Sequence, residues 1–441
     1  MVLTTVYHIA GFINSLIWYA VTCVIQSLTG YNLLTDDDGS MASVPTTADL
    51  AATAGYNVRE HVVTTKDGYI LVLHKLESAQ PTLGKKGVVY FHHGLLTDSE
   101  TWVVGDVNLP YMLVDQGYQV WLGNNRGNRY SRKHLRLSPS DKQFWNFSLD
   151  EYAMYDIPAS LEHIYQFNNG TSRITYVGFS QGCSQLLATL SLRPDLNNIL
   201  NLFVGLSPAV IPQNLSHPIF KMIVNRSSRN NQFLYSLFGT RAIFPSVAYW
   251  QTWKWYSSVV DTALQYLFGW KLNNISSEQR SRVYPHLFSN TSVKSVHHWF
   301  QIIDAKRFQM FDEHVNIGLS HFSNYHPGHQ VPPFPIAHHL DVPMVLAFGD
   351  ADILVDINHT TKLITENNPQ MKSKMWEVID CPTYEHMDTL WASDVEKLYN
   401  RILPHIERAN RMITDSDSTL ALDDGEVENT QSPKFYKLIT N

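Results

Sequence analysis

The chain of 441 residues has only three cysteines, Cys23, Cys183 and Cys381. So few cysteines exclude a disulfide framework, and because none form a CxxC pair, they also exclude a zinc site built on that motif. No HExxH motif occurs either, so no metal or other cofactor is expected. Lys and Arg number 33 against 40 Asp and Glu, a net charge of −7. Without a basic cluster, nucleic acid is not an expected partner.

The first 35 residues contain no Asp, Glu, Lys or Arg. Within them, residues 9–28 are mostly apolar, and a helix of that length spans about 30 Å, the thickness of a hydrocarbon core. We therefore predict that residues 1–35 form a membrane anchor, either spanning the bilayer or lying in its interface, followed by a linker over residues 36–54. Two alternatives stay open. The segment could be a cleaved signal peptide, although it lacks a positively charged start, or a buried helix.

Short apolar runs alternate with helical stretches along the rest of the chain, up to about residue 413. Residues 59–65 and 69–76 flank Lys66-Asp67-Gly68 and predict a hairpin. Further strands are predicted over residues 87–92, 118–123, 173–179, 201–206, 343–349 and 374–380. A helix is predicted over residues 150–167, kinked by Pro158. Alternating strands and helices indicate an α/β fold with a mostly parallel central sheet.

The interval between the strands at 201–206 and 343–349 far exceeds the roughly 30 residues of a β–α–β crossover. Residues 207–342 are therefore predicted as a largely helical insertion that divides the core into residues 55–206 and 343–413. Its helical face around Val260 and Leu264 either packs on the core or forms a cap over a lipid-sized pocket. The acidic residues 414–441 are predicted to be a disordered tail.

Gly178-Phe179-Ser180-Gln181-Gly182 matches the pattern G-x-S-x-G. It lies between a predicted strand and a predicted helix, the context that a nucleophile elbow requires. We therefore predict that Ser180 is a nucleophile, and the alternative is an ordinary helix N-cap. Because a serine hydroxyl reacts poorly at neutral pH, it needs a histidine base and a carboxylate that orients the base.

In such a fold the acid follows a late strand and the histidine follows the last strand. Asp350, Asp352 and Asp356 all follow the strand at 343–349. Asp352 is the predicted acid, because Asp350 lies close enough to the strand to shape the turn and Asp356 suits a helix cap. His386 is the predicted base, whereas His359 precedes the last strand.

The loop His92-His93-Gly94-Leu95-Leu96 follows the third predicted strand. Loops at this position supply one backbone N–H of an oxyanion hole, and the residue after the nucleophile supplies the other. The predicted donors are therefore the backbone amides of Leu95 and Gln181, while His92 and His93 position the loop. A further loop, residues 123–128, lacks the spacing of a phosphate site, so its Arg126 is expected to tie neighbouring loops together.

Several of these motifs, taken in order, resemble the acid lipase family of lysosomal and gastric lipases over about residues 55–403. The resemblance rests on residues 60–71, 93–96, 123–128, 131–134, 178–182 and 384–388. It implies an α/β-hydrolase fold with a cap and a serine carboxylic-ester hydrolase that uses no metal, with Ser180, Asp352 and His386 as its triad.

Three departures from the animal lipases point toward the fungal steryl ester hydrolase branch. Phe179 stands where the animal enzymes usually have histidine, the insertion has no cysteine pair, and an anchor-like segment replaces the secretory signal. The expected substrate is a neutral lipid, a steryl ester or acylglycerol, and the expected location is a membrane, a lipid droplet or the endoplasmic reticulum. Seven N-x-S/T sequons would suit a glycosylated lumenal domain: Asn146, Asn169, Asn214, Asn225, Asn274, Asn290 and Asn358.

Two other functions stay open. One is a triacylglycerol lipase of secreted or lysosomal type, with residues 1–30 or so removed as a signal peptide. The other is a non-catalytic lipid-binding protein on a hydrolase scaffold.

Overall fold

The structure is a computed structural model that describes residues 44–78, 86–212, 256–313 and 331–423. Between these ranges it also describes 215, 217–229, 234–235, 238–243 and 251–252. The predicted anchor over residues 1–35 lies outside these residues, so it stays a prediction. Among the helices of the described part, none is both long and apolar enough to cross a membrane.

Nine described strands form one mixed sheet, in the order β1-β2-β4-β3-β6-β7-β8-β9, with β5 paired to β2. From β4 to β9 every neighbouring pair is parallel, while β1, β2 and β4 pair antiparallel. The strands are β1 (Tyr56–Thr64), β2 (Tyr69–Ser78), β3 (Val88–His92), β4 (Gln119–Leu122), β5 (Lys133–His134), β6 (Ile174–Phe179), β7 (Leu200–Leu206), β8 (Met344–Gly349) and β9 (Met375–Cys381). All the predicted strands are present, shifted by a few residues at most, and only the two-residue β5 was not predicted.

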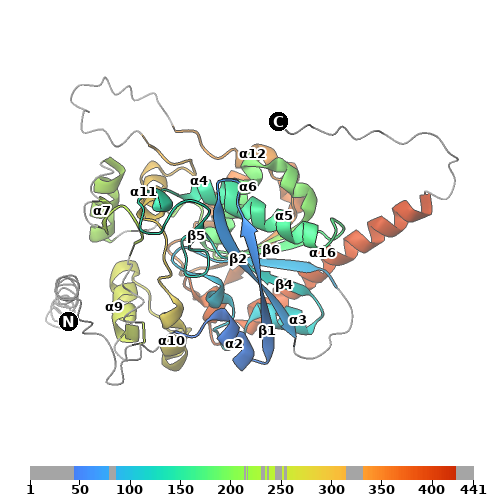
Figure 1. Ribbon diagram of the computed structural model, residues 1–441, viewed down its shortest axis with the longest axis horizontal. Helices are drawn as coiled ribbons and strands as arrows, with labels where there is room; N and C mark the ends of the chain where they lie inside the picture. Colours follow the sequence, from blue (N-terminus) through green and yellow to red (C-terminus); the bar gives the residue numbers. More distant parts are fainter. Residues whose placement is uncertain are drawn as a thin grey trace.

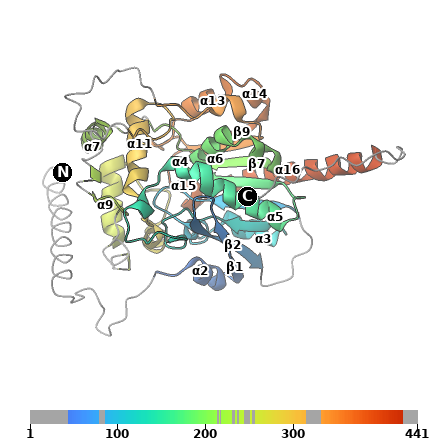
Figure 2. The ribbon, with the colours of Figure 1, turned by 45° about the horizontal axis from the view of Figure 1, so that its top comes forward.

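Helices cover both faces of the sheet (Figures 1 and 2). The helices outside the insertion are α2 (Thr47–Thr53), α3 (Leu109–Asp115), α4 (Leu149–Glu151), α5 (Ile157–Phe167), α6 (Gln181–Leu192), α13 (Ile357–Thr365), α14 (Gln370–Lys374), α15 (Asp388–Trp391) and α16 (Glu396–Asp423). Along β3, Val88 and Tyr90 belong to one buried cluster and Val89 and Phe91 to another, because successive strand residues face opposite sides.

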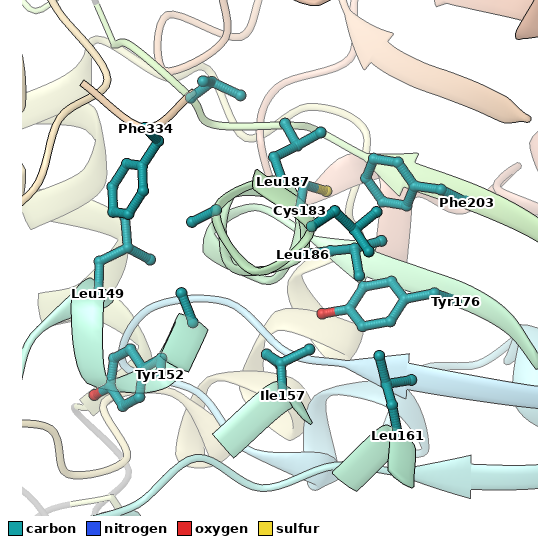
Figure 3. Packing of buried hydrophobic residues seen from close by; sticks show 14 of the residues in the cluster. Leu149, Tyr152, Ile157, Leu161, Tyr176, Cys183, Leu186, Leu187, Phe203 and Phe334 are labelled. Atoms are coloured by element: carbon teal, nitrogen blue, oxygen red, sulfur yellow. The ribbon is translucent and has the colours of Figure 1, made fainter. Parts of the chain in front are cut away.

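The first cluster packs α5 and α6 onto the sheet. Figure 3 shows Leu186 and Leu187 of α6 among residues from α5, β6 and β7. Every residue of α6 from Gln181 to Ser191 is buried, so this helix crosses the interior and holds its first turn rigidly at the end of β6. The second cluster packs α3 and α16 on the opposite face.

The predicted helix over residues 150–167 is interrupted as expected. A π-helical turn over Tyr152–Asp156 separates α4 from α5, and Pro158 lies in the first turn of α5. Proline has no N–H to donate to the preceding turn, and the first turn of a helix is where that loss costs least.

Two predicted boundaries differ from the structure. Within the predicted linker, Thr46 and Asp49 form a reciprocal capping box that starts α2, and the buried Thr47 bonds Ser99 and Tyr130. The folded domain therefore includes residues before Gly55, at least from Val44 onward. At the other end, α16 extends to Asp423, so the first part of the predicted disordered tail is helical.

The insertion between β7 and β8 contains α7 (Pro218–Arg229), α9 (Tyr256–Phe268), α10 (Ser277–Val283), α11 (Val293–Ala305) and α12 (Ile336–His339) among the described residues. Both ribbon views place α7, α9 and α11 on the side of the molecule away from α16 (Figures 1 and 2). In α9, Val260 is buried and Leu264 packs on the second cluster, so part of the predicted apolar face does pack on the core.

Candidate active site

The parallel strands end at the same edge of the sheet, and the candidate residues follow β3, β6, β8 and β9 there. Ser180 stands between β6 and α6 with φ +52° and ψ −118°, a strained conformation for a residue with a side chain. The two flanking glycines make the turn possible. A Cβ on Gly178 would lie 2.9 Å from the Cys183 nitrogen, and one on Gly182 only 2.3 Å from the His92 oxygen.

The structure brings Ser180, His386 and Asp352 together in one chain of hydrogen bonds. The Ser180 Oγ lies 2.7 Å from His386 Nε2, and His386 Nδ1 lies 2.7 Å from Asp352 Oδ2. All three side chains are buried. Because the Asp352 carboxylate can only accept a hydrogen bond, Nδ1 is the protonated ring nitrogen and Nε2 faces Ser180 as an acceptor.

The other two candidate acids form hydrogen bonds elsewhere. Asp350 Oδ1 accepts the Thr383 amide and so ties the turn after β8 to the turn after β9. Asp356 caps α13 by accepting the His359 amide. Both aspartates therefore have the structural roles that the sequence predicted for them.

His92 and His93 brace the loop that follows β3. His93 Nδ1 lies 2.8 Å from the Gly94 carbonyl, and its Nε2 accepts the Asn125 amide. His92 contacts the Tyr90 hydroxyl and the Asn125 side chain. Burial lowers the pKa of His92 to about 4 and that of His93 well below its ordinary value. Both rings are therefore uncharged at neutral pH and support the loop through their hydrogen bonds.

The segments that carry the two predicted oxyanion donors both adjoin Ser180. Gly94, which precedes Leu95, approaches so closely that its Cβ position would be 3.1 Å from the Ser180 Cβ. Gln181 is the first residue of α6, where backbone amides have no partner within the helix. The Gln181 side chain accepts a 2.6 Å hydrogen bond from the Trp299 indole of α11, which ties this position to the insertion.

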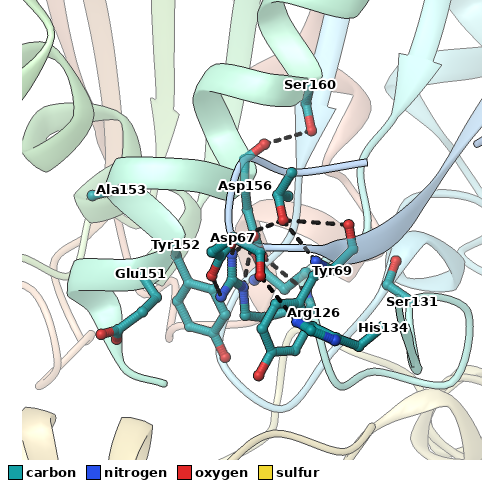
Figure 4. Close-up of polar contacts among 12 residues, drawn as sticks. Asp67, Tyr69, Arg126, Ser131, His134, Glu151, Tyr152, Ala153, Asp156 and Ser160 are labelled. Carbon is teal, nitrogen blue, oxygen red and sulfur yellow. Dashed lines mark hydrogen bonds and ion pairs between the residues drawn. The ribbon is translucent and has the colours of Figure 1, made fainter. Parts of the chain in front are cut away.

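Arg126 holds together three segments of the core (Figure 4). Its guanidinium bonds Asp67 in the hairpin turn and Asp156 in the π-helical turn, and it stacks 3.9 Å from the centre of the Tyr69 ring. The side chain is fully enclosed. It therefore ties neighbouring loops together, as predicted.

Three contacts of the site escaped prediction. Trp299 meets Gln181, Trp270 stacks on the His386 ring, and Glu385 binds the backbone next to Trp270. Each contact joins residues more than a hundred positions apart, so no local sequence pattern predicts it. Among the described residues, no group of three or more His, Cys, Asp or Glu side chains is placed to hold a metal ion.

This fold, with a serine, histidine and aspartate in contact at the strand ends, defines an α/β-hydrolase with a serine nucleophile elbow. Comparison with known families agrees. The model of a partial alpha/beta-hydrolase lipase region matches residues 47–106, and that of the alpha/beta hydrolase fold matches residues 87–390.

Among α/β-hydrolases, the individual proteins most informative for this chain are lipases. A probable lipase of Schizosaccharomyces pombe is 42% identical over 349 residues, 78% of this chain and 75% of the relative. The human lysosomal acid lipase/cholesteryl ester hydrolase is 32% identical over 365 residues, 79% of this chain and 87% of the relative. The gastric triacylglycerol lipase of Rattus norvegicus is 31% identical over 363 residues, 79% of this chain and 88% of the relative. The chain belongs to the acid lipase family.

Proposed function

We propose that this enzyme hydrolyses carboxylic esters of neutral lipids through an acyl-enzyme, and that steryl esters are its main substrates. The observation that carries the proposal is the unbroken contact from Ser180 through His386 to Asp352, with 2.7 Å at each step. Such a chain supplies the activated alcohol that ester cleavage requires.

In the proposed mechanism, Ser180 Oγ attacks the ester carbonyl while His386 Nε2 takes its proton. The carbonyl oxygen gains the negative charge, which the Leu95 and Gln181 amides stabilise. The imidazolium then gives its proton to the leaving alcohol, and the acyl group stays on Ser180. Water attacks the acyl-enzyme with His386 again as the base, which releases the fatty acid. Asp352 keeps the imidazole in the required tautomer throughout.

The preference for steryl esters is supported by a relative at 32% identity that is named a cholesteryl ester hydrolase. A relative at 31% identity is named a triacylglycerol lipase, which makes triacylglycerol the second candidate substrate. The test is a hydrolysis assay with cholesteryl oleate and triolein in matched emulsions, run beside Ser180→Ala. We expect faster release of oleate from the steryl ester, and loss of both activities in the variant.

Faster hydrolysis of triolein would contradict the preference and favour the triacylglycerol lipase. Unchanged turnover by Ser180→Ala would contradict the mechanism itself. Absence of any esterase activity would favour a non-catalytic lipid-binding protein.

We further propose that the helical insertion caps the site and that residues 1–35 anchor the enzyme to a membrane or lipid droplet. Trp299 and Trp270 of the insertion already contact Gln181 and His386. A poorly soluble substrate collects at lipid surfaces, so an anchor would keep the enzyme where its substrate is. Deleting residues 1–35 should release the protein from sedimented membranes while sparing hydrolysis of p-nitrophenyl butyrate. Continued sedimentation with membranes would contradict the anchor.

A further inference from the structure

We propose that Glu385 is a positioning residue: by binding the backbone of the insertion at Lys271 and Leu272, it holds Trp270 against the His386 ring and fixes that ring for proton transfer. The inference rests on the function proposed above and extends it to a residue outside the Ser–His–Asp chain. We call the insertion segment over residues 270–274 the clamp segment, and it lies between α9 and α10.

The Glu385 carboxylate sits in a small anion-binding turn. One of its oxygens accepts the Lys271 amide, and the other accepts the Leu272 amide at 2.9 Å. Leu272 has a φ of +57°, in the left-handed region that a residue with a side chain seldom adopts. Consecutive backbone N–H groups in such a turn form a concavity suited to an anion, and Glu385, buried at 5% exposure, fills it.

A second set of hydrogen bonds fastens the other end of the clamp segment. The Asn274 amide group donates to the Thr383 carbonyl at 2.8 Å and to Asp388 Oδ2 at 2.7 Å. That same Asp388 oxygen accepts the Glu385 backbone amide at 2.6 Å. The turn that carries His386 is therefore tied to the insertion on both sides of the histidine.

Trp270 is the part of the clamp segment that reaches the histidine ring. Its ring is nearly parallel to that of His386, at 19° between planes and 6.1 Å between centres, and it is buried. Phe179 packs against the imidazole as well, with 5.2 Å between ring centres. The imidazole thus has one aromatic neighbour from the insertion and another from the core. Together they limit how far the ring can turn while it keeps its hydrogen bond to Asp352.

The position of the ring matters because both proton transfers pass through Nε2. A displacement of about 1 Å in a catalytic group can cost about 10² in rate. Loss of the contacts between Glu385 and the clamp segment should therefore lower kcat on a small soluble ester and leave KM nearly unchanged.

The chain offers a matched control for this test. The buried Asp150 carboxylate accepts the Phe311 amide of the insertion at 3.0 Å. Asp150→Asn and Glu385→Gln thus make the same chemical change at two contacts between core and insertion, and only Glu385 adjoins His386. Both variants should lose similar thermal stability. On p-nitrophenyl butyrate, Glu385→Gln should lower kcat about 10–100-fold and slow labelling by a fluorophosphonate probe in proportion, while Asp150→Asn should stay near wild type.

A double-variant cycle tests the route through Trp270. If Glu385 acts by placing that ring, Trp270→Ala combined with Glu385→Gln should lower kcat little more than the stronger single change, because coupled residues are not additive. Fully multiplicative losses would overturn the inference. Asn274→Ala removes the hydrogen bonds at the other end of the clamp segment and should also lower kcat. This second variant keeps the test decisive should Glu385→Gln fail to fold.

The outcomes separate the two proposals. If the probe labels wild type at Ser180 and Glu385→Gln reacts equally fast, the clamp is wrong and the proposed function stands. Equal losses of kcat in Glu385→Gln and Asp150→Asn would also overturn the clamp. If wild type fails to react with the probe at all, the proposed function is wrong, and the role proposed for Glu385, which rests on it, is wrong as well.

Discussion

At the scale of single residues, the site depends on how closely α6 approaches the loop after β3. A methyl group on Gly182 would lie 2.3 Å from the His92 oxygen and 2.8 Å from the His93 oxygen, and both are backbone atoms that cannot move aside easily. We expect Gly182→Ala to destabilise the fold by about 3 kcal/mol or more, measured by urea unfolding. At Gly55, with φ +88° and open space around its Cβ position, alanine should cost only about 1–2 kcal/mol. Similar losses at the two positions would contradict this account.

The three aspartates after β8 offer a second comparison. Asp352→Asn should leave the fold intact and lower kcat about 10⁴-fold with little change in KM, because the amide favours the wrong histidine tautomer. Asp350→Asn should keep kcat within about tenfold of wild type, since Asp350 bonds only the turn at Thr383. Steady-state kinetics on p-nitrophenyl butyrate measures both. A larger loss for Asp350→Asn than for Asp352→Asn would show that the acid was assigned wrongly.

Single residues also show what the sequence could predict. Ser180, Asp352 and His386 each follow a strand in the chain order of this fold, so their meeting could be anticipated from position alone. Trp270, Trp299 and Glu385 could not, because their contacts depend on how the insertion packs back on the core. Each of these contacts joins positions more than a hundred residues apart, which no local pattern in the sequence encodes.

At the scale of elements, Arg126 joins the β1–β2 hairpin turn, the loop after β4 and the π-helical turn before α5. Arg126→Met would leave the fully enclosed Asp156 carboxylate without its cationic partner, with only the backbone amide of residue 126 still donating to it. The expected loss is about 3–5 kcal/mol in the free energy of unfolding. Arg193→Met breaks two ion pairs, with Glu162 and Asp195, that are more exposed than those of Arg126. It should lower the free energy of unfolding by less than about 1 kcal/mol. Equal effects in urea titrations would contradict the role given to Arg126.

The elements themselves were largely predictable. The strands are apolar runs bounded by turn residues, so their existence and order follow from hydrophobic burial. α2 was missed because its short, polar-capped sequence resembles a linker, and only its packing on the core reveals its buried residues. β5 has two residues, too few to carry any pattern.

At the scale of the whole molecule, two opposed sets of buried groups govern stability against pH. Burial lowers the pKa of four histidines to about 4, namely His74, His92, His286 and His298. Because the unfolded chain takes up protons first, their contribution to stability is lost as pH falls from about 6.5 toward 4. Burial raises the pKa of five carboxyls to about 6 or 7, namely Asp98, Glu100, Asp150, Asp156 and Asp388. Their contribution is present at low pH and is lost as pH rises through 6 to 7.

The two sets act in opposite directions, so each offsets part of the other's effect on the free energy of unfolding between pH 5 and pH 7. Asp388→Asn removes one of the carboxyls whose pKa is raised by burial. In that variant, stability should fall on acidification from pH 7 to pH 5 by about 1 kcal/mol more than in wild type. Chemical denaturation at several pH values measures both. A fall in Asp388→Asn no larger than the fall in wild type would contradict the role given to this carboxyl.

The central claim is that Ser180 carries the acyl group during turnover. The most direct measurement mixes the enzyme with p-nitrophenyl butyrate, quenches in acid within the first turnover and locates the butyryl group by peptide mass spectrometry. We expect a butyryl ester on the peptide containing Ser180, and none in the Ser180→Ala variant. A butyryl group on another residue, or hydrolysis by Ser180→Ala at the wild-type rate, would contradict it.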